Sequence, residues 1–151
     1  MPESARPIRT YLLDTNVFVA AIKNPRRETE TLRFLLSLIG RDDVELVGNE
    51  YWVEEMVRYA EEFRAQTAAW LVAVLMNRTR LVRVGENYLR VCARYLGTPD
   101  PADVLHAATC LQERAILISN DKHFNRIRDE GVIEVWSFSQ AIRSLSGRGK
   151  R

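Results

Sequence analysis

The chain has little cysteine and no long apolar run. Its 151 residues include two cysteines, Cys92 and Cys110, and neither belongs to a CxxC pair. This excludes a disulfide framework or a zinc finger, and it favours a reducing, cytoplasmic location. The longest apolar stretch, residues 68–76, is too short to cross a bilayer. We therefore expect no membrane partner, and the first nine residues lack the apolar core of a secretory signal.

An excess of charge of one sign is also lacking. The 22 Lys and Arg residues nearly balance the 20 Asp and Glu residues, which gives a net charge of +2. This balance excludes a polybasic binder and an acidic disordered tail. It does not exclude nucleic acid as a substrate, because charges can be segregated on a protein surface. Hydrophobic residues make up 46% of the chain, enough for a packed core. We expect one domain at residues 1–146 and a short basic tail at 147–151.

Apolar stretches of two kinds alternate along the chain. Short, nearly continuous apolar runs are typical of buried parallel strands, and longer stretches have helical spacing. The predicted strands cover residues 8–13, 44–48, 81–84, 115–118 and 132–136. The predicted helices cover residues 17–22, 28–39, 50–63, 67–76, 86–95, 101–113, 121–129 and 137–145. This alternation predicts an α/β fold with helices on both faces of a parallel sheet.

Acidic residues follow the ends of the predicted strands. Asp14 comes directly after the first strand, Asp121 follows the fourth, and Asp103 begins a helix that leads into that fourth strand. A glutamate at 54 or 55 lies in the helix after the second strand. Since the carboxyl ends of parallel strands meet at one edge, where such sheets bind ligands, we expect these acids to converge.

Converging carboxylates repel one another and raise each other's pKa values. Such a cluster persists when a divalent cation neutralises it, and oxygen ligands select Mg²⁺ or Mn²⁺. A cation of this kind lowers the pKa of bound water and neutralises charge on phosphate oxygens, which is the chemistry of phosphodiester hydrolysis. The alternative is that each acid only caps a helix, as Asp14, Asp100 and Asp121 are all placed to do.

Several other activities do not fit. A haloacid-dehalogenase-like phosphatase needs a second Asp two residues after Asp14, where this chain has Asn16. A P-loop nucleotide hydrolase needs GxxxxGK[ST], which is missing. A zinc site around His106 would lack a fourth ligand, so we expect His106 to pack beside the core with a satisfied nitrogen. We expect His123 to be a polar residue near the mouth of the site rather than a general base.

Four acidic segments resemble those of a known family. They are Leu12–Phe18, Tyr51–Val57, Pro101–Thr109 and Ile118–Phe124. Their order and spacing are similar to those of the PIN-domain ribonucleases, especially the small VapC toxins, across essentially the whole chain. The resemblance implies a three-layer α/β/α sandwich with a five-stranded parallel sheet of order 3-2-1-4-5. It also implies metal-dependent cleavage of RNA.

The resemblance also implies roles for individual residues. Asp14, Asp103 and Asp121 correspond to ligands of Mg²⁺ or Mn²⁺, and Glu55 corresponds to the fourth catalytic acid. Glu54 is the alternative to Glu55, because the two lie about 100° apart on a helix and only one can face the site. The residues implied to orient ligands, or to be possible site groups, are Asn16, Glu54, Asp100 and Ser119. Some relatives carry a further acid where this chain has Asn125, so the resemblance implies either one or two metal ions.

Basic residues near the acidic helices are expected to bind phosphates that flank the cleaved bond. They are Arg58, Arg64, Lys122 and Arg126, and the alternative is that they form solvated helix faces. The helix at residues 67–76, which contains Trp70, is either core or the surface of a homodimer.

The function expected from these features is a metal-dependent ribonuclease that hydrolyses RNA phosphodiester bonds. We expect it to be the toxin of a type II toxin–antitoxin pair, with a small antitoxin protein as partner. Two alternatives stay open: a stand-alone PIN-domain RNA-processing nuclease, and a catalytically inactive PIN-like module that binds RNA or protein.

Overall fold

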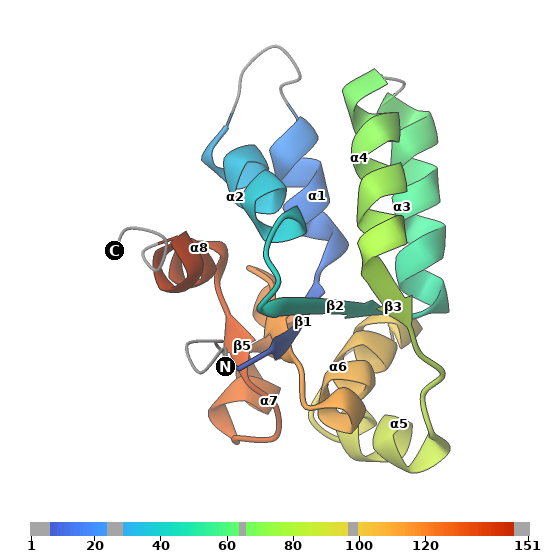
Figure 1. Ribbon diagram of the computed structural model, residues 1–151. Helices are drawn as coiled ribbons and strands as arrows, with labels where there is room; N and C mark the ends of the chain where they lie inside the picture. The colour runs from blue at the N-terminus through green and yellow to red at the C-terminus, as the bar shows by residue number, and fades with distance from the viewer. Residues whose placement is uncertain (1–6, 24–28, 64–65, 97–99, 147–151) are drawn as a thin grey trace.

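A five-stranded, all-parallel sheet forms the centre of the computed structural model, which describes residues 7–23, 29–63, 66–96 and 100–146 (Figure 1). The strand order is β3-β2-β1-β4-β5, so the predicted order 3-2-1-4-5 is confirmed. The strands are β1 (Arg9–Leu13), β2 (Val44–Gly48), β3 (Thr79–Leu81), β4 (Ile116–Ile118) and β5 (Val135–Trp136). The predicted tail at 147–151 lies outside the described residues.

Helices cover both faces of this sheet and make the three predicted layers (Figure 1). One layer contains α1 (Thr15–Ile22), α2 (Glu30–Ile39), α3 (Glu50–Phe63), α4 (Gln66–Arg78) and α8 (Phe138–Ser146). The other contains α5 (Glu86–Ala93), α6 (Pro101–Glu113) and α7 (Asn125–Asp129), with the 3₁₀ turn η1 (Lys122–Phe124) beside α6. Among the described residues, no helix combines the length and the apolar character needed to cross a membrane.

The register of the central strands sets which residues meet at the carboxyl edge. Leu13, the last residue of β1, pairs with Ile118, the last residue of β4. The backbone N–H of Asp14 then donates to the carbonyl of Ile118 at 3.0 Å. The residues that follow the two strands, Asp14 and Ser119, are therefore brought side by side by backbone pairing alone.

Two strands differ from their predicted positions. The third strand was predicted at residues 81–84, but β3 covers Thr79–Leu81 because Thr79 pairs with Leu46 in the middle of β2. The hydroxyl of Thr79 donates to the carbonyl of Leu75 at 2.6 Å and ends α4 there. The fifth strand was predicted at 132–136 and is shortened to its last two residues, after a turn in which Gly131 has a φ of +75°.

The helix predicted at 67–76 packs mainly as core, since Leu71 and Leu75 of α4 are buried. Trp70 on the same helix is 53% exposed.

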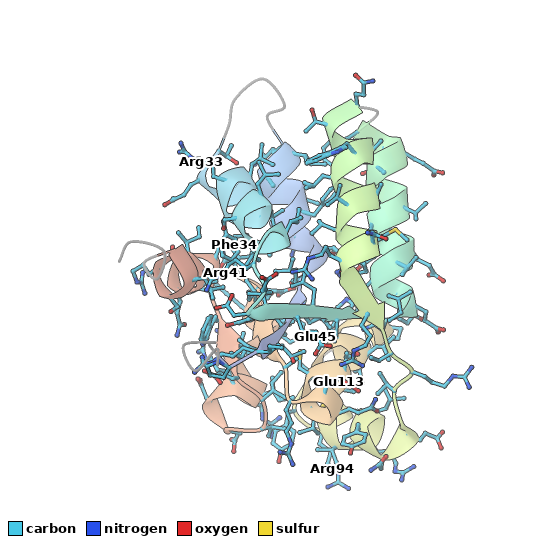
Figure 2. All side chains as sticks on the ribbon, viewed as in Figure 1. Arg33, Phe34, Arg41, Glu45, Arg94 and Glu113 are labelled. Atoms are coloured by element: carbon cyan, nitrogen blue, oxygen red, sulfur yellow. The ribbon has the colours of Figure 1, made fainter. Side chains whose placement is uncertain are left out.

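An ion-pair network lies in the amino-terminal half of the sheet, away from the converging acids. The guanidinium of Arg80 contacts Glu45 of β2 at 3.0 Å and Glu113 at the end of α6 at 3.0 Å. Figure 2 labels the two glutamates, Glu45 and Glu113. These contacts lower the pKa of the Glu45 carboxyl. The side chains are substantially exposed, so we assign the network a small contribution to stability.

Candidate metal centre

Asp14 is buried at the point where β1 passes into α1. It is 7% exposed, and its Oδ1 accepts from the backbone N–H of Asn16 at 3.3 Å, which caps α1. Its Oδ2 accepts from the hydroxyl of Ser119 at 2.5 Å. Burial raises the pKa of the Asp14 carboxyl, and the hydrogen bond from Ser119 partly opposes that rise. An ionised Asp14 is therefore costly unless positive charge is close.

Ser119 joins Asp14 to the second acid of the site, Asp121. The Ser119 Oγ that donates to Asp14 also accepts from the backbone N–H of Asp121 at 3.0 Å. The Oδ1 of Asp121 accepts in turn from the backbone N–H of His123 at 2.9 Å and caps η1. The turn after β4 thus contains Ser119 and Asp121, and the hydrogen bonds of Ser119 connect this turn to Asp14 at the end of β1.

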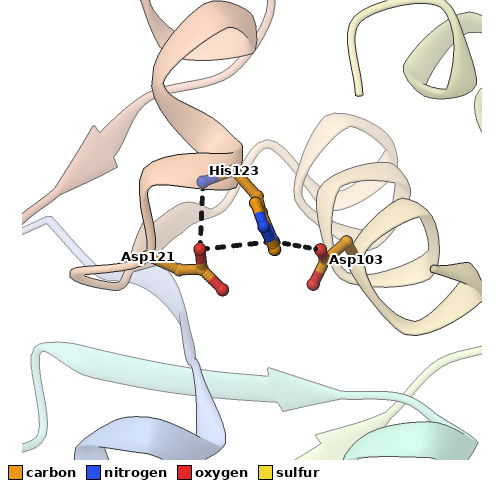
Figure 3. Close-up of side chains that lie close together, drawn as sticks. All are labelled: Asp103, Asp121 and His123. Carbon is orange, nitrogen blue, oxygen red and sulfur yellow. Dashed lines mark hydrogen bonds and ion pairs between the residues drawn. The ribbon is translucent and has the colours of Figure 1, made fainter. Parts of the chain in front are cut away.

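Asp103 approaches this turn from the first turn of α6. Its side chain is 11% exposed, and its pKa is raised first by burial and then by the charge of Asp100. Asp100 caps α6, with its Oδ1 accepting from the backbone N–H of Ala102 at 2.9 Å. The carboxylates of Asp103 and Asp121 and a ring nitrogen of His123 offer ligand atoms that all lie within 4.8 Å of one another (Figure 3).

Among the described residues, this group of close ligand atoms comes from Asp103, Asp121 and His123 and does not include Asp14. Asp14 is connected to Asp121 by the two hydrogen bonds of Ser119.

Glu55 lies on α3 and is held from two sides. The hydroxyl of Thr15 donates to its Oε1 at 3.2 Å, and Nε2 of His106 lies 3.5 Å from the same oxygen. The hydrogen bond from His106 is the largest cause of the lowered pKa of the Glu55 carboxyl, so this group is ionised at neutral pH. Glu54, one residue earlier, is exposed.

Buried hydrogen bonds of Asn49 decide which ring nitrogen of His106 carries the proton. Asn49 accepts the backbone N–H of Trp52 on its Oδ1 at 3.0 Å, so its Nδ2 points the other way, 3.1 Å from Nδ1 of His106. The same Nδ2 donates to the hydroxyl of Thr109 at 2.9 Å. Because Nδ1 of His106 accepts from Asn49, the ring proton is assigned to Nε2, which faces Glu55.

Trp52 ties α3 to the end of β1. Its indole N–H donates to the carbonyl of Leu13 at 2.9 Å, and the side chain is 1% exposed. Gly48 makes room for the indole, since a Cβ there would lie 3.0 Å from ring atoms of Trp52. Leu13 precedes Asp14 and Glu55 lies one helical turn after Trp52, so this one contact positions two of the acids relative to each other.

The other predicted site residues are exposed where the structure describes them. Asn16 is exposed and contributes its backbone N–H. Lys122 is exposed on η1, and Arg126 on α7 has its guanidinium 5.7 Å from the ring centre of Tyr95. Arg58 is exposed on α3 and lies 5.2 Å from the ring centre of Tyr59. Arg64 lies outside the described residues.

The sequence interpretation missed three features of the site. Thr15 holds Glu55, and Asn49 holds His106 beside it. His123 was placed at the mouth of the site, whereas its ring reaches between two carboxylates. The signal available for Thr15 and Asn49 was a polar residue within two positions of the end of a strand.

The donor set suits a hard divalent cation. Carboxylate oxygens are the ligands that Mg²⁺ and Mn²⁺ prefer, and two of these carboxyl groups, Asp14 and Asp103, have pKa values raised by burial. A bound cation would offset that cost, so the residues present fit such an ion.

Comparisons with known proteins agree with this arrangement. The PIN-domain family model matches residues 11–130. The structure of VapBC-1 from nontypeable Haemophilus influenzae is similar, with a TM-score of 0.60 and 21% identity, over 86% of this chain and 98% of that chain. VapBC2 from Rickettsia felis bound to a DNA fragment from their promoter is similar too. It has a TM-score of 0.61 and 17% identity, over 85% of this chain and 98% of that chain. No curated protein sequence matches the chain. The family match spans most of the chain and includes all four acidic positions, so the chain belongs to the PIN-domain family.

Proposed function

We propose that this protein is a metal-dependent endoribonuclease and the toxin of a type II toxin–antitoxin pair. The observation that carries the nuclease proposal is the meeting of acids from separate segments at the carboxyl edge of the sheet. Ligand atoms of Asp103 and Asp121 lie within 4.8 Å of each other, and Ser119 connects Asp14 to Asp121 by hydrogen bonds. Membership of the PIN-domain family supports the same activity.

In this proposal Asp14, Asp103 and Asp121 hold Mg²⁺ or Mn²⁺. When bound, the cation supplies an acidified water and neutralises the charge that develops on the phosphate. The protein's part is to keep the carboxylates in place without the cost of rearrangement. It does this with backbone N–H groups and the Ser119 hydroxyl, which donate to both oxygens of Asp14 and to Oδ1 of Asp121.

In this proposal Glu55 accepts a proton from the attacking water. Thr15 and His106 both hold Oε1, so we assign Oε2 to the water. The lowered pKa keeps the carboxylate ionised and able to accept at neutral pH. The Nε2–H group of His106 donates a hydrogen bond to Glu55 and holds its carboxylate in one orientation.

Single-stranded or looped RNA is the proposed substrate, because its exposed phosphates suit a site on the open edge of a sheet. Arg58 is exposed on α3, which carries Glu55, and Lys122 and Arg126 are exposed on η1 and α7, which follow Asp121. Arg64 comes six residues after Arg58 in the sequence. We propose that these cations bind phosphates on either side of the cleaved bond.

Cleavage of a fluorescent single-stranded RNA with Mn²⁺ tests the activity. Asp14→Asn removes a charge from the site, whereas Asp42→Asn makes the same change at an exposed loop residue before β2. We expect a loss of at least a hundredfold for Asp14→Asn, no change for Asp42→Asn, and full loss of wild-type activity with EDTA. Equal rates for all three proteins, or no cleavage by any, would refute the proposal.

The fold similarity to two VapBC structures supports the antitoxin partner. We also propose a cytoplasmic location, in keeping with the two unpaired cysteines. A short reading frame that encodes a small DNA-binding protein directly upstream, and its co-purification with this chain, would be the expected result. A chain that cleaves RNA and has no such partner would instead be a stand-alone RNA-processing nuclease. We also propose a homodimer that uses the exposed Trp70 face of α4, which light scattering of wild type and Trp70→Glu tests.

A further inference from the structure

His123 occupies an unusual position for an exposed side chain. The ring is 54% exposed, yet its Nδ1 lies 2.9 Å from Oδ2 of Asp103 and 3.3 Å from Oδ1 of Asp121 (Figure 3). Its backbone is fixed relative to the same site, because the N–H of His123 donates to Oδ1 of Asp121. The turn that places Asp121 therefore also places the imidazole.

Nδ1 of His123 is hydrogen-bonded to Asp103, and its distances from the two carboxylates also match those between neighbouring ligands of one cation. Metal–ligand bonds of about 2.1 Å at right angles put adjacent ligand atoms about 3.0 Å apart. Nδ1 of His123 lies at about this separation from a carboxylate oxygen on each side. A cation shared by Asp103 and Asp121 therefore lies within reach of that nitrogen after a small rotation of an exposed ring.

We propose that His123 is a third protein ligand of the cation held by Asp103 and Asp121, and that its nitrogen shifts the preference of the site from Mg²⁺ toward Mn²⁺. This rests on the proposed function, since it concerns the same cation. Sites built from carboxylate and water oxygens suit Mg²⁺, whereas an imidazole nitrogen is a softer ligand that favours transition metals. The proposal replaces the sequence interpretation of His123 as a polar residue at the mouth.

The chain offers a clean way to detect this nitrogen, because it contains two histidines. His106 is buried, with Nδ1 accepting from Asn49 and Nε2 facing Glu55. Neither nitrogen of His106 is directed to the Asp103–Asp121 pair. If a magnetic coupling between bound Mn²⁺ and an imidazole nitrogen disappears when His123 is replaced, the coupled nitrogen therefore belongs to His123.

The experiment compares wild type, His123→Ala and His123→Asp by pulsed electron paramagnetic resonance of bound Mn²⁺ and by calorimetric titration with Mn²⁺ and Mg²⁺. We expect nitrogen modulation in wild type and none in either variant. His123→Ala should weaken Mn²⁺ binding at least tenfold and Mg²⁺ binding less than threefold. His123→Asp keeps a ligand but supplies oxygen, so it should restore Mg²⁺ binding and leave Mn²⁺ weaker than in wild type.

Three results would overturn the proposal. They are bound Mn²⁺ without nitrogen modulation in wild type, modulation that persists in His123→Ala, and equal losses of Mn²⁺ and Mg²⁺ affinity. If wild type also cleaves RNA in the first case, only the role of His123 fails. If wild type binds neither cation and does not cleave RNA, the proposed function fails with it.

Discussion

Replacing Trp52 by Phe tests whether the contact between α3 and β1 holds the site together. Phe cannot donate to the carbonyl of Leu13, and leaving a buried acceptor without that partner costs about 1–3 kcal/mol. The smaller ring leaves space in a core position that is 1% exposed, which costs about 1–2 kcal/mol more. The expected loss of about 2–5 kcal/mol lowers the melting temperature by about 4–20 °C in a chain of this size.

Trp70→Phe is the matched control, since it makes the same chemical change on α4 at a side chain that is 53% exposed. We expect its free energy of unfolding to stay within about 0.5 kcal/mol of wild type. Urea unfolding followed by far-ultraviolet circular dichroism measures both variants. Trp52→Phe should also weaken Mn²⁺ binding, because Asp14 and Glu55 lose their common support. Equal stabilities of the two variants, or a Trp52→Phe protein as stable as wild type, would refute the reasoning.

Three further changes test the packing, the hydrogen bond of His106 and the buried charge. Gly48→Ala should cost about 1–3 kcal/mol in urea unfolding because its Cβ meets the pinned indole, whereas Gly40→Ala, with open space around it, should change stability by less than about 0.5 kcal/mol. His106→Leu should slow RNA cleavage about ten- to a hundredfold, and His106→Gln, whose amide can still donate toward Glu55, should recover part of that loss. Asp14→Asn should raise the free energy of unfolding of the metal-free protein at pH 7. Burial raises the pKa of Asp14, so its ionised form is the costly one; this advantage of Asn should shrink in thermal melts as the pH falls through the raised pKa toward 3.8.

The parallel sheet and the position of the acids could be predicted because both depend on local sequence, whereas the strand order was implied by the resemblance to the PIN-domain family. Apolar runs of strand length, separated by helical repeats, predict a parallel sheet, and the residues after each strand then lie at the carboxyl edge. Asp14 follows directly from that rule, as the pairing of Leu13 with Ile118 shows, and Asp121 comes three residues after Ile118. The third strand could not be placed in this way, because its position is set by pairing with β2 and by the Thr79 hydroxyl that ends α4.

The contacts of the histidines could not be predicted from the sequence. His106 and Glu55 are 51 residues apart, and their approach depends on how α6 packs across from α3. The direction of the His106 proton depends further on Asn49, which is oriented by its own capping bond to Trp52. The periodicity of apolar residues indicates which face of a helix is apolar, but it carries no information on hydrogen bonds that link several side chains.

Helix capping and cation binding, which are alternatives when the sequence is considered alone, are compatible in the folded protein. Asp14 and Asp121 each give Oδ1 to a backbone N–H, so capping fixes the carboxylate and accounts for one of its two oxygens. Capping does not account for Asp103, which lies inside the first turn of α6 after Asp100 has already capped that helix. The Asp103 carboxyl is largely buried, lies opposite another acid and has a pKa raised by burial, a cost that its hydrogen bond with His123 offsets only in part. Helix capping does not explain this carboxylate, whereas the proposed cation would.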